Sequence, residues 1–312
     1  MKIVITGGTG FIGRALCRAL AAEGHDVVVL SRRAGEGELG LDPSVRVVEW
    51  DGVTAGPWER ELEAADAVIN LAGASIAEAR WTAERKRMIY ESRIAPTRLL
   101  AQALGRASAR PRMFLSASGV GYYGPRDDRP LQEHDPPGTG FLAELCVAWE
   151  REAMSAQQAG ARVVCLRFGM VLEKDGGALP KMLPPFRAFI GGPIGPGTQW
   201  VSWIHRQDLI GIMEWVLAAP AVSSPVNAVA PGAVTMREFC ATLGRVLRRP
   251  SWLPVPERVL RLALGELGTV LTTGQRVLPE VAQQGGYRFR YPSLEPALQA
   301  ILGPAVSARP AA

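Results

Sequence analysis

A glycine-rich segment near the N-terminus has the residue types and spacing of a phosphate-binding loop. Residues 6–13 read TGGTGFIG, between a short apolar run and an amphipathic stretch. Glycine at 7 permits a tight turn, glycine at 10 lets the backbone approach a pyrophosphate, and glycine at 13 lets helix and strand pack closely. The N–H groups and positive dipole end of the following helix also favour an anion. A plain tight turn explains this spacing poorly, so we expect a dinucleotide site formed by Gly7, Thr9, Gly10, Phe11, Ile12 and Gly13.

The end of the second apolar run indicates which dinucleotide is bound. An NAD site usually places Asp or Glu there, to hold the ribose hydroxyls. Here Ser31, Arg32 and Arg33 follow the run, so two guanidinium groups replace the acid, and guanidinium suits phosphate. We predict NADP(H), with Ser31 and Arg32 on its 2′-phosphate and Arg33 beside them. The alternative is a solvated charge pair at the end of a strand.

Short apolar runs that alternate with amphipathic stretches must position these groups. The runs predict strands and the stretches predict helices. The alternation predicts right-handed crossovers and a parallel sheet. We therefore expect the α/β class, with a Rossmann-type doubly wound parallel sheet and a smaller, mostly helical C-terminal substrate lobe. The predicted strands are 3–6, 27–30, 45–49, 67–71, 113–116 and 163–167, and the predicted helices are 11–22, 83–104 and 140–157.

The pattern loosens after Val171, where glycine and proline predict long turns. A strand at 200–204, a helix at about 207–217 and a strand at 226–229 follow, and then a capping box at 235–238 opens a helix. Residues 250–302 predict more helix, and 304–312 a frayed tail. We expect residues 1–170 and about 200–230 to form the NADP-binding domain, and about 171–199 and 231–303 to form the smaller lobe.

Composition narrows the class of protein. The 312 residues have a net charge of +5, with 47% hydrophobic and 21% charged residues, which is typical of a globular protein. No apolar stretch has the length of a membrane span, and the N-terminus lacks the features of a signal peptide. We therefore expect a cytoplasmic protein without a membrane partner. The four cysteines and three histidines lack metal-ligand spacing, and scattered arginines disfavour nucleic acid.

Several motifs resemble those of the extended short-chain dehydrogenase/reductases. They are the glycine loop, the sequence NLAG at 70–73, and SAS at 116–118 ahead of Tyr122 and Tyr123. More specifically, the chain resembles the atypical, NAD-dependent epimerase-like branch with an uncharacterised C-terminal domain of the DUF1731 type, over about residues 1–300. The further landmarks of that branch are Trp81, Ser92, Arg93, Cys146, Trp149, Glu150, 181–187, 191–195 and 203–205.

This resemblance implies a Rossmann fold that binds NADP(H) and acts on a small molecule. It places Leu71, Ala72 and Gly73 in the turn against the adenosine half of the cofactor. Arg93 is implied as a further cofactor contact, and Val171 lies at a position near the nicotinamide end. Precedent in the superfamily favours a monomer or a homodimer.

The Tyr-x-x-x-Lys pair of that superfamily is absent from this chain. In the family, the tyrosine works as acid or base while the lysine lowers its pKa. If Glu150 marks the position four residues after the lysine, Leu142 and Cys146 occupy the two sites. A shift of one residue gives Phe141 and Leu145, which supply no phenol or ammonium either.

Other side chains could replace the missing proton donor. Ser118 keeps the position of the substrate-orienting hydroxyl, and Tyr122 or Tyr123 could donate a proton from the next loop or simply pack on its rim. We take Ser118 and Tyr123 as the catalytic candidates. For His205 we favour a structural role over catalysis, and we expect Asp208 to lie at a helix N-terminus. The segment 181–187 is either a lid over a substrate or a surface loop.

Two functions fit these observations. The first is an NADP-dependent oxidoreductase or epimerase that acts on an unidentified small molecule through hydride transfer. The second is a non-catalytic NADP(H)-binding regulatory or scaffold protein. The glycine loop supports both, the absent pair favours the second, and the retained landmarks favour the first, which we prefer.

Overall fold

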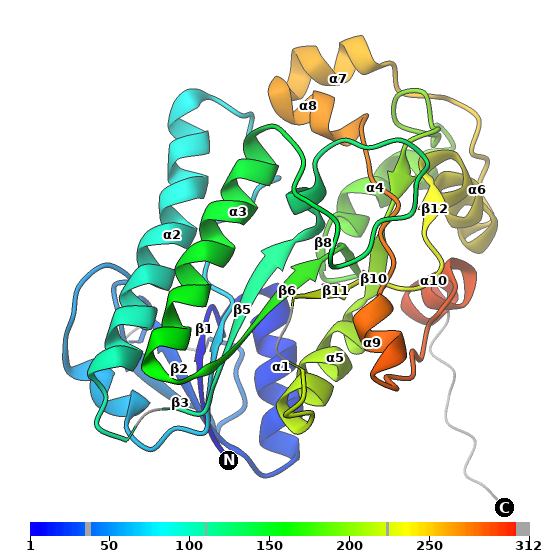
Figure 1. Ribbon diagram of the computed structural model, residues 1–312. Coiled ribbons are helices and arrows are strands. Elements are labelled where there is room, and N and C mark those ends of the chain that lie inside the picture. The colour runs from blue at the N-terminus through cyan, green and yellow to red at the C-terminus, as the bar shows by residue number, and fades with distance from the viewer. Residues whose placement is uncertain (35–38, 110, 223–224, 304–312) are drawn as a thin grey trace, which may run out of the picture.

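A seven-stranded parallel sheet forms the centre of the computed structural model, which describes residues 1–34, 39–109, 111–222 and 225–303 (Figure 1). The strand order is β11-β6-β5-β4-β1-β2-β3. From β1 the chain runs outward through β2 and β3, and it then crosses back to β4 on the other side of β1. A switch point of this kind commonly opens a crevice at the carboxyl ends of the strands. The strands are β1 (Lys2–Thr6), β2 (Asp26–Ser31), β3 (Arg46–Glu49), β4 (Ala67–Asn70), β5 (Met113–Gly119), β6 (Arg162–Phe168) and β11 (Val226–Ala228).

Helices cover both faces of this sheet. On one face α1 (Phe11–Ala22) and α5 (Arg206–Ala218) pack against Ile3 and Ile5, and on the other α2 (Ala83–Arg106) and α3 (Phe141–Met154) cover Val4 (Figure 1). Successive residues of β1 therefore enter different cores, and all three are fully buried. Burial on both faces explains the continuous apolar runs of the sequence.

Most of the predicted elements are confirmed. The first helix has the predicted bounds, and Gly24 follows it with φ +78°. The predicted capping box forms as well, because Thr235 and Glu238 bond reciprocally at the start of α6 (Met236–Leu247). The prediction missed three 3-10 helices, Pro57–Leu62, Val120–Tyr123 and Ser155–Ala159.

Small sheets and short helices form the rest of the chain. One sheet has the order β10-β7-β8, and β12 pairs with β9. The single strand predicted at 200–204 is wrong, since Ser202 separates two short strands. The predicted division into two domains stays a prediction, and the predicted tail, 304–312, lies outside the described residues. These elements are β7 (Met170–Glu173), β8 (Gly176–Gly177), β9 (Trp200–Val201), β10 (Trp203–His205), β12 (Val234–Thr235), α4 (Leu179–Arg187), α7 (Glu257–Leu264), α8 (Glu266–Leu271), α9 (Glu280–Gln284) and α10 (Leu294–Leu302).

Helix α4 corrects the prediction of a loop at 181–187. Pro180 lies in its first turn, where a missing N–H costs nothing. Pro184 and Pro185 lie inside the helix and remove two donors, but the helix buries Leu183 and Phe186 in the core of the C-terminal lobe. Burial of this apolar face outweighs the low helix propensity of proline.

Helix α8 packs against the helices that cover one face of the large sheet. Leu267 of α8 packs with Trp81 and with Leu145 of α3. Lys86 of α2 forms an ion pair with Glu266 at 2.7 Å. Figure 1 shows α7 and α8 above the N-terminal ends of α2 and α3, on the same side as the carboxyl ends of the strands.

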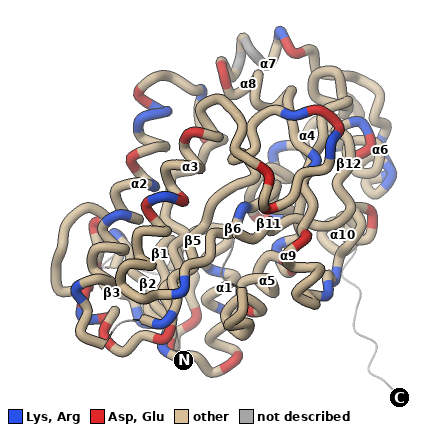
Figure 2. The backbone as a smooth tube through the Cα atoms, in the orientation of Figure 1, with Lys and Arg blue, Asp and Glu red and all other residues tan. Residues whose placement is uncertain are grey.

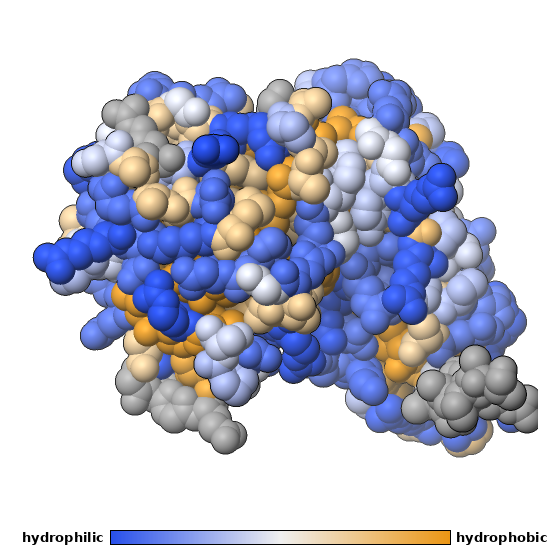
Figure 3. Space-filling view, turned by 90° about the horizontal axis from the view of Figure 1, so that it is seen from below, coloured by the Kyte–Doolittle hydropathy of each residue, from blue (hydrophilic) through white to orange (hydrophobic). Residues whose placement is uncertain are grey.

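Charge and hydropathy are mixed over the molecule. Figure 2 shows basic and acidic residues interspersed along both halves of the chain. Figure 3 shows the face where the strands begin, which is hydrophilic over most of its area with separate apolar patches. Among the described residues, no helix combines the length and apolar character needed to cross a bilayer.

Candidate functional site

The glycine loop joins β1 to α1 at the switch point of the sheet. Gly7 has φ +71°, and a Cβ there would lie 2.5 Å from the Leu71 carbonyl oxygen. A Cβ on Gly13 would lie 2.2 Å from the Gly7 oxygen, so this position requires glycine for packing. On Gly10 the nearest atom would be 3.2 Å away. No described side chain caps the α1 N-terminus, so its N–H groups remain available to an anion.

The three residues predicted at the cofactor phosphate lie at the end of β2. Ser31 is buried, and its hydroxyl accepts a hydrogen bond from the Arg33 backbone N–H at 3.1 Å. Arg32 and Arg33 are both exposed. Since β2 is the direct neighbour of β1, the two guanidinium groups are carried on the strand beside the glycine loop.

The Asn70 side chain fixes the turn after β4 beside the glycine loop. It lies between Thr6 of β1 and Ser116 of β5 in strand register. Its side-chain oxygen accepts from the Thr6 hydroxyl at 2.7 Å, and its nitrogen donates to the Thr97 hydroxyl at 2.8 Å. The Leu71 N–H also donates to the Thr6 carbonyl oxygen. This turn, which contains Leu71, Ala72 and Gly73, is thereby fixed beside the glycine loop.

Arg93 of α2 lies directly under that turn. A Cβ on Gly73 would lie 3.1 Å from the Arg93 guanidinium carbon. The guanidinium donates to the carbonyl oxygens of Ala74 and Ile89 and lies 5.2 Å from the centre of the Trp149 ring. Burial lowers the pKa of Arg93 to about 10, so the group stays charged at neutral pH. Its hydrogen bonds to described residues go to neutral oxygens, so an anion could gain from this charge.

The β7–β8 hairpin covers the glycine loop. A Cβ on Gly176 would lie 2.3 Å from the Phe11 ring, so the hairpin approaches that ring through glycine. Val171 lies in β7, where it is buried in the main core. Arg206 lies 5.0 Å from the centre of the Phe11 ring and pairs with Glu173 of the hairpin. The loop therefore contacts a segment more than 160 residues away.

A buried polar network lies at the carboxyl ends of β5, β6 and β11. Ser118, Arg167 and Asn227 are neighbours across these strands. Arg167 donates two hydrogen bonds to Glu150 of α3, both at 2.9 Å, and the Ser118 hydroxyl donates to the same carboxylate at 2.7 Å. Because its proton is held by Glu150, the Ser118 oxygen can offer only lone pairs to a ligand.

Tyr123 belongs to the interior of this network. It is 0% exposed, its hydroxyl donates to Asn227 at 2.8 Å, and it accepts from Arg167 at 2.9 Å. Burial raises its pKa to about 12. Tyr122 is only partly buried, and the Arg167 guanidinium lies 3.5 Å from the centre of its ring.

Helix α3 carries apolar groups at the two positions where the resemblance predicts the catalytic pair. Leu142 packs against Gly121, where a Cβ would lie 3.0 Å away, and joins the apolar cluster that contains Trp81 and Leu267. Cys146 is buried next to Ser118 and Gly119, and burial raises its pKa to about 11. The thiol is therefore neutral at physiological pH.

The structural roles expected for His205 and Asp208 are confirmed. His205 caps α5 by accepting from the Gln207 N–H at 3.0 Å, and it stacks on Tyr291 at 4.0 Å. Burial lowers its pKa to about 4, so it is neutral at physiological pH. Asp208, in the first turn of α5, accepts from the N–H groups of Arg290 and Tyr291. Both side chains hold the C-terminal segment.

The structure brings most of the predicted residues to one edge of the sheet. Lys181 reaches that edge too, because its ammonium group donates to the Ala77 carbonyl oxygen in the loop after β4. The sequence also contained signals for residues that the prediction missed. One arginine in the apolar run of β6 indicated a paired buried charge, and adjacent glycines at 176 and 177 indicated a close approach. Glu150 was used only as a position marker.

Comparisons with known proteins assign the family. A model described as the NAD dependent epimerase/dehydratase family matches residues 3–229, and one described as a domain of unknown function, DUF1731, matches residues 255–301. A chloroplastic homolog of epimerase family protein SDR39U1 from Arabidopsis thaliana is 41% identical, covering 97% of this chain and 87% of the relative. Epimerase family protein YfhF of Bacillus subtilis is 40% identical, with 97% and 98% covered.

One structure with the same fold was solved with NADPH. The crystal structure of human epimerase family protein SDR39U1 (isoform2) with NADPH has a TM-score of 0.86 and 36% identity, covering 96% of this chain and 99% of that one. A UDP-glucuronic acid 4-epimerase from Bacillus cereus has a TM-score of 0.75 at 17% identity, which supports the fold alone. The chain is a member of the NAD dependent epimerase/dehydratase family, with a C-terminal DUF1731 domain.

Proposed function

We propose that this protein binds NADP(H) and acts as an oxidoreductase or epimerase on a small molecule with a hydroxyl or carbonyl group. The observation that carries the proposal is the glycine loop packed against the turn at 70–73, at the switch point of the sheet. It offers uncapped helix N–H groups together with buried cationic Arg93. The NADPH in the structure of the human relative supports the same cofactor here.

In this proposal the residues of the loop bind the pyrophosphate and those after β2 hold the 2′-phosphate. The loop residues are Gly7, Thr9, Gly10, Phe11, Ile12 and Gly13, and the others are Ser31, Arg32 and Arg33. Leu71, Ala72 and Gly73 pack on the adenosine half, Arg93 contacts the cofactor from below, and Val171 lies near the nicotinamide. The bound cofactor supplies or accepts a hydride.

The protein's own groups orient the substrate and manage the proton. Ser118 would accept a hydrogen bond from a substrate hydroxyl, because Glu150 holds its own proton. Tyr123 suits a positioning role better than the role of proton donor that the sequence suggests, since a proton donor must reach its substrate and this hydroxyl is buried between Asn227 and Arg167. Tyr122, the more exposed phenol, is the better candidate donor.

Titration with NADPH and NADH tests the cofactor assignment. We expect NADPH to bind more tightly than NADH, and Arg32→Ala to weaken NADPH binding by at least about tenfold, since an Arg–phosphate contact is a strong charge-assisted bond. The same change should leave NADH binding nearly unaltered. Arg87→Ala, on the exposed face of α2, is the matched control. Equal losses for both cofactors would contradict the 2′-phosphate assignment.

One observation favours a second function, a non-catalytic NADP(H)-binding regulatory or scaffold protein. Leu142 and Cys146 form apolar contacts where the family has its catalytic groups. A screen of carbonyl substrates that follows the absorbance of NADPH distinguishes the two functions. Tight NADPH binding without turnover of any substrate would support the second.

A further inference from the structure

Four large apolar side chains form an exposed ridge on the C-terminal lobe. Phe189, Ile190, Trp252 and Leu253 are 54%, 51%, 63% and 41% exposed. The ridge is continuous, because the backbone N–H groups of Trp252 and Leu253 donate to the Gly191 carbonyl oxygen and the Trp252 indole donates to the Phe189 oxygen. Such a cluster on a globular surface commonly marks an interaction site.

Two residues of this region, Phe189 and Arg248, adopt a left-handed backbone conformation, which points to a functional role of their side chains. Phe189 and Arg248 have φ of +64° and +55°, and they follow the C-terminal ends of α4 and α6. Glycine adopts this conformation without strain and is the usual residue at such helix ends. A bulky aromatic and a charged residue at these positions are strained, and strain of this kind concentrates at functional sites.

The ridge is surrounded by positive charge. Segments 187–197 and 245–256, which build it, contain four arginines and no Asp or Glu. Arg245 pairs with Glu295, whereas the Arg249 guanidinium lies 4.4 Å from the centre of the Phe189 ring. Arg187 and Arg248 are exposed. Figure 2 shows basic segments near α6, with acidic ones among them. The charge complementary to this surface is therefore negative.

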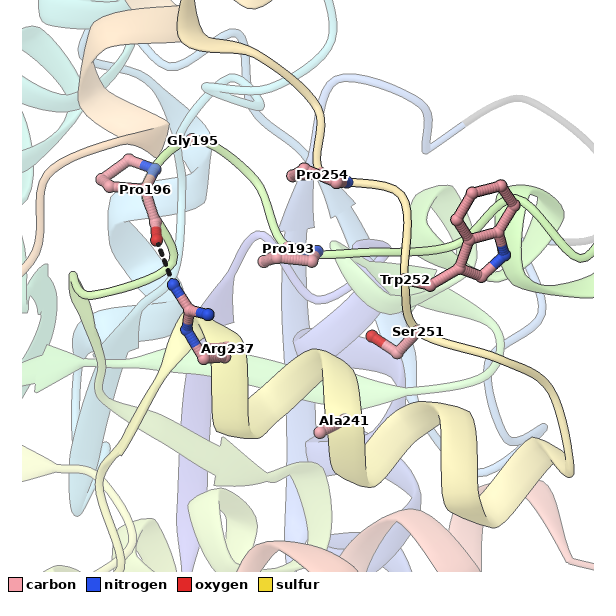
Figure 4. Close-up of a pocket in the computed structure, with 8 residues that line it drawn as sticks. All are labelled: Pro193, Gly195, Pro196, Arg237, Ala241, Ser251, Trp252 and Pro254. Carbon is pink, nitrogen blue, oxygen red and sulfur yellow. Dashed lines mark hydrogen bonds between the residues drawn. The ribbon is translucent and has the colours of Figure 1, made fainter.

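A pocket of about 370 Å³ opens beside the ridge, between α6 and the two segments (Figure 4). Three prolines and Trp252 form its apolar wall. The Arg237 guanidinium and the Ser251 hydroxyl give it polar groups, and one nitrogen of Arg237 already donates to the Pro196 carbonyl oxygen at 3.1 Å. An anionic headgroup with a short polar stem matches this combination. The prolines are Pro193, Pro196 and Pro254.

We propose that the ridge docks this protein on the surface of an anionic phospholipid membrane, with a lipid headgroup at Arg237. Aromatic residues prefer the membrane interface, and arginines gain from anionic headgroups. A second copy of the chain fits less well, because a twofold contact would bring the arginines of both copies together. The absence of a membrane partner was predicted from the lack of a spanning segment, which peripheral docking does not need.

Flotation of the full chain with vesicles tests this proposal. We expect binding to vesicles of phosphatidylcholine and phosphatidylglycerol in a two-to-one ratio, and little binding to phosphatidylcholine alone. The double variant Phe189→Ser/Trp252→Ser, and separately Arg248→Glu, should each lower partitioning about tenfold, because apolar burial and headgroup attraction both contribute. High salt should weaken binding of the wild type.

Matched controls separate docking from loss of the fold. Val53→Ser removes an equally exposed apolar side chain elsewhere, and Arg87→Glu reverses an exposed charge on α2; both should bind as the wild type does. Circular dichroism melting checks that the ridge variants fold. Equal binding to neutral vesicles, or unchanged binding by well-folded ridge variants, would overturn the proposal.

Two further measurements would overturn it in favour of another occupant. A dimer in light scattering that Trp252→Ser dissociates, with no vesicle binding, would assign the ridge to a second copy. Binding of soluble glycerol phosphate that depends on Arg237, again without vesicle binding, would assign the pocket to a small ligand.

Discussion

The glycine loop and the Arg167 network lie at the same edge of one sheet, yet only the loop can be recognised from the sequence alone. The loop closes on itself within eight residues, because a Cβ on Gly13 would touch backbone atoms of Gly7 and Gly8. The network joins Arg167 to Glu150 and Tyr123 to Asn227, which is 104 positions away. Local backbone constraints leave a readable spacing, whereas contacts that depend on strand register appear only once the strands are paired.

The largest loss of stability is expected from a substitution in the Arg167 network, and it tests the comparison most severely. Arg167→Met should lower the free energy of unfolding by about 3–5 kcal/mol, because it leaves the Glu150 carboxylate buried without its partner. Urea denaturation measures the loss. The double variant Glu150→Leu/Arg167→Met should recover much of it. A loss below about 1 kcal/mol for the single variant would equate this pair with a surface ion pair.

Acid should destabilise the protein through His205. The folded pKa of about 4 lies below the ordinary value of 6.5, so between these values the unfolded chain binds a proton that the folded chain does not. His205 therefore costs nothing above about pH 6.5, and its cost grows as the pH falls to 4, to about 3 kcal/mol. His205→Asn keeps a capping oxygen without the titration. Parallel stability curves for variant and wild type across this pH range would contradict the assignment.

A methyl group in the glycine loop should act through the backbone alone. Gly13→Ala places a Cβ 2.2 Å from the Gly7 oxygen, and we expect a loss of about 2–3 kcal/mol together with weaker NADPH binding. Thermal melting and NADPH titration measure the two effects. Gly24→Ala is the control, because nothing lies within 4 Å of its Cβ and only its positive φ opposes alanine, at about 1 kcal/mol. Equal losses of stability for both variants would show that the contact between the Gly13 Cβ and the Gly7 oxygen is not the cause.

The smallest loss of stability is expected from a substitution of Tyr123, which tests whether this residue positions Arg167 or donates a proton. Tyr123→Phe should cost about 1–2 kcal/mol, because Arg167 and Asn227 each lose a partner. If Tyr123 only positions Arg167, NADPH binding should persist and any turnover should fall in part. Complete loss of turnover with an unchanged melting temperature would restore it as the proton donor.

Sequence periodicity predicted the elements of the large sheet well and the elements after residue 171 less well. The first helix has its predicted bounds because an apolar stripe, a glycine loop and a glycine cap all mark it. Helix α4 was missed because Pro184 and Pro185 argue against a helix that only burial in the lobe can stabilise. The residues proposed for the cofactor could be predicted from motifs. The partners of Arg167 could not, since its neighbours Ser118 and Asn227 follow from strand order.

The hydrogen bonds between the C-terminal segment and the residues at the edge of the sheet also constrain the order in which the chain can fold. Asp208 needs the N–H groups of Arg290 and Tyr291, and Asn227 donates to the Leu278 carbonyl oxygen. These buried groups therefore lack their partners until residues 278–291 have left the ribosome. A nascent chain that ends near residue 230 has all seven strands but not the bonds that complete their edge. Final consolidation of the seven-stranded sheet is thus expected only after residues 278–291 have been synthesised, although all of its strands precede them.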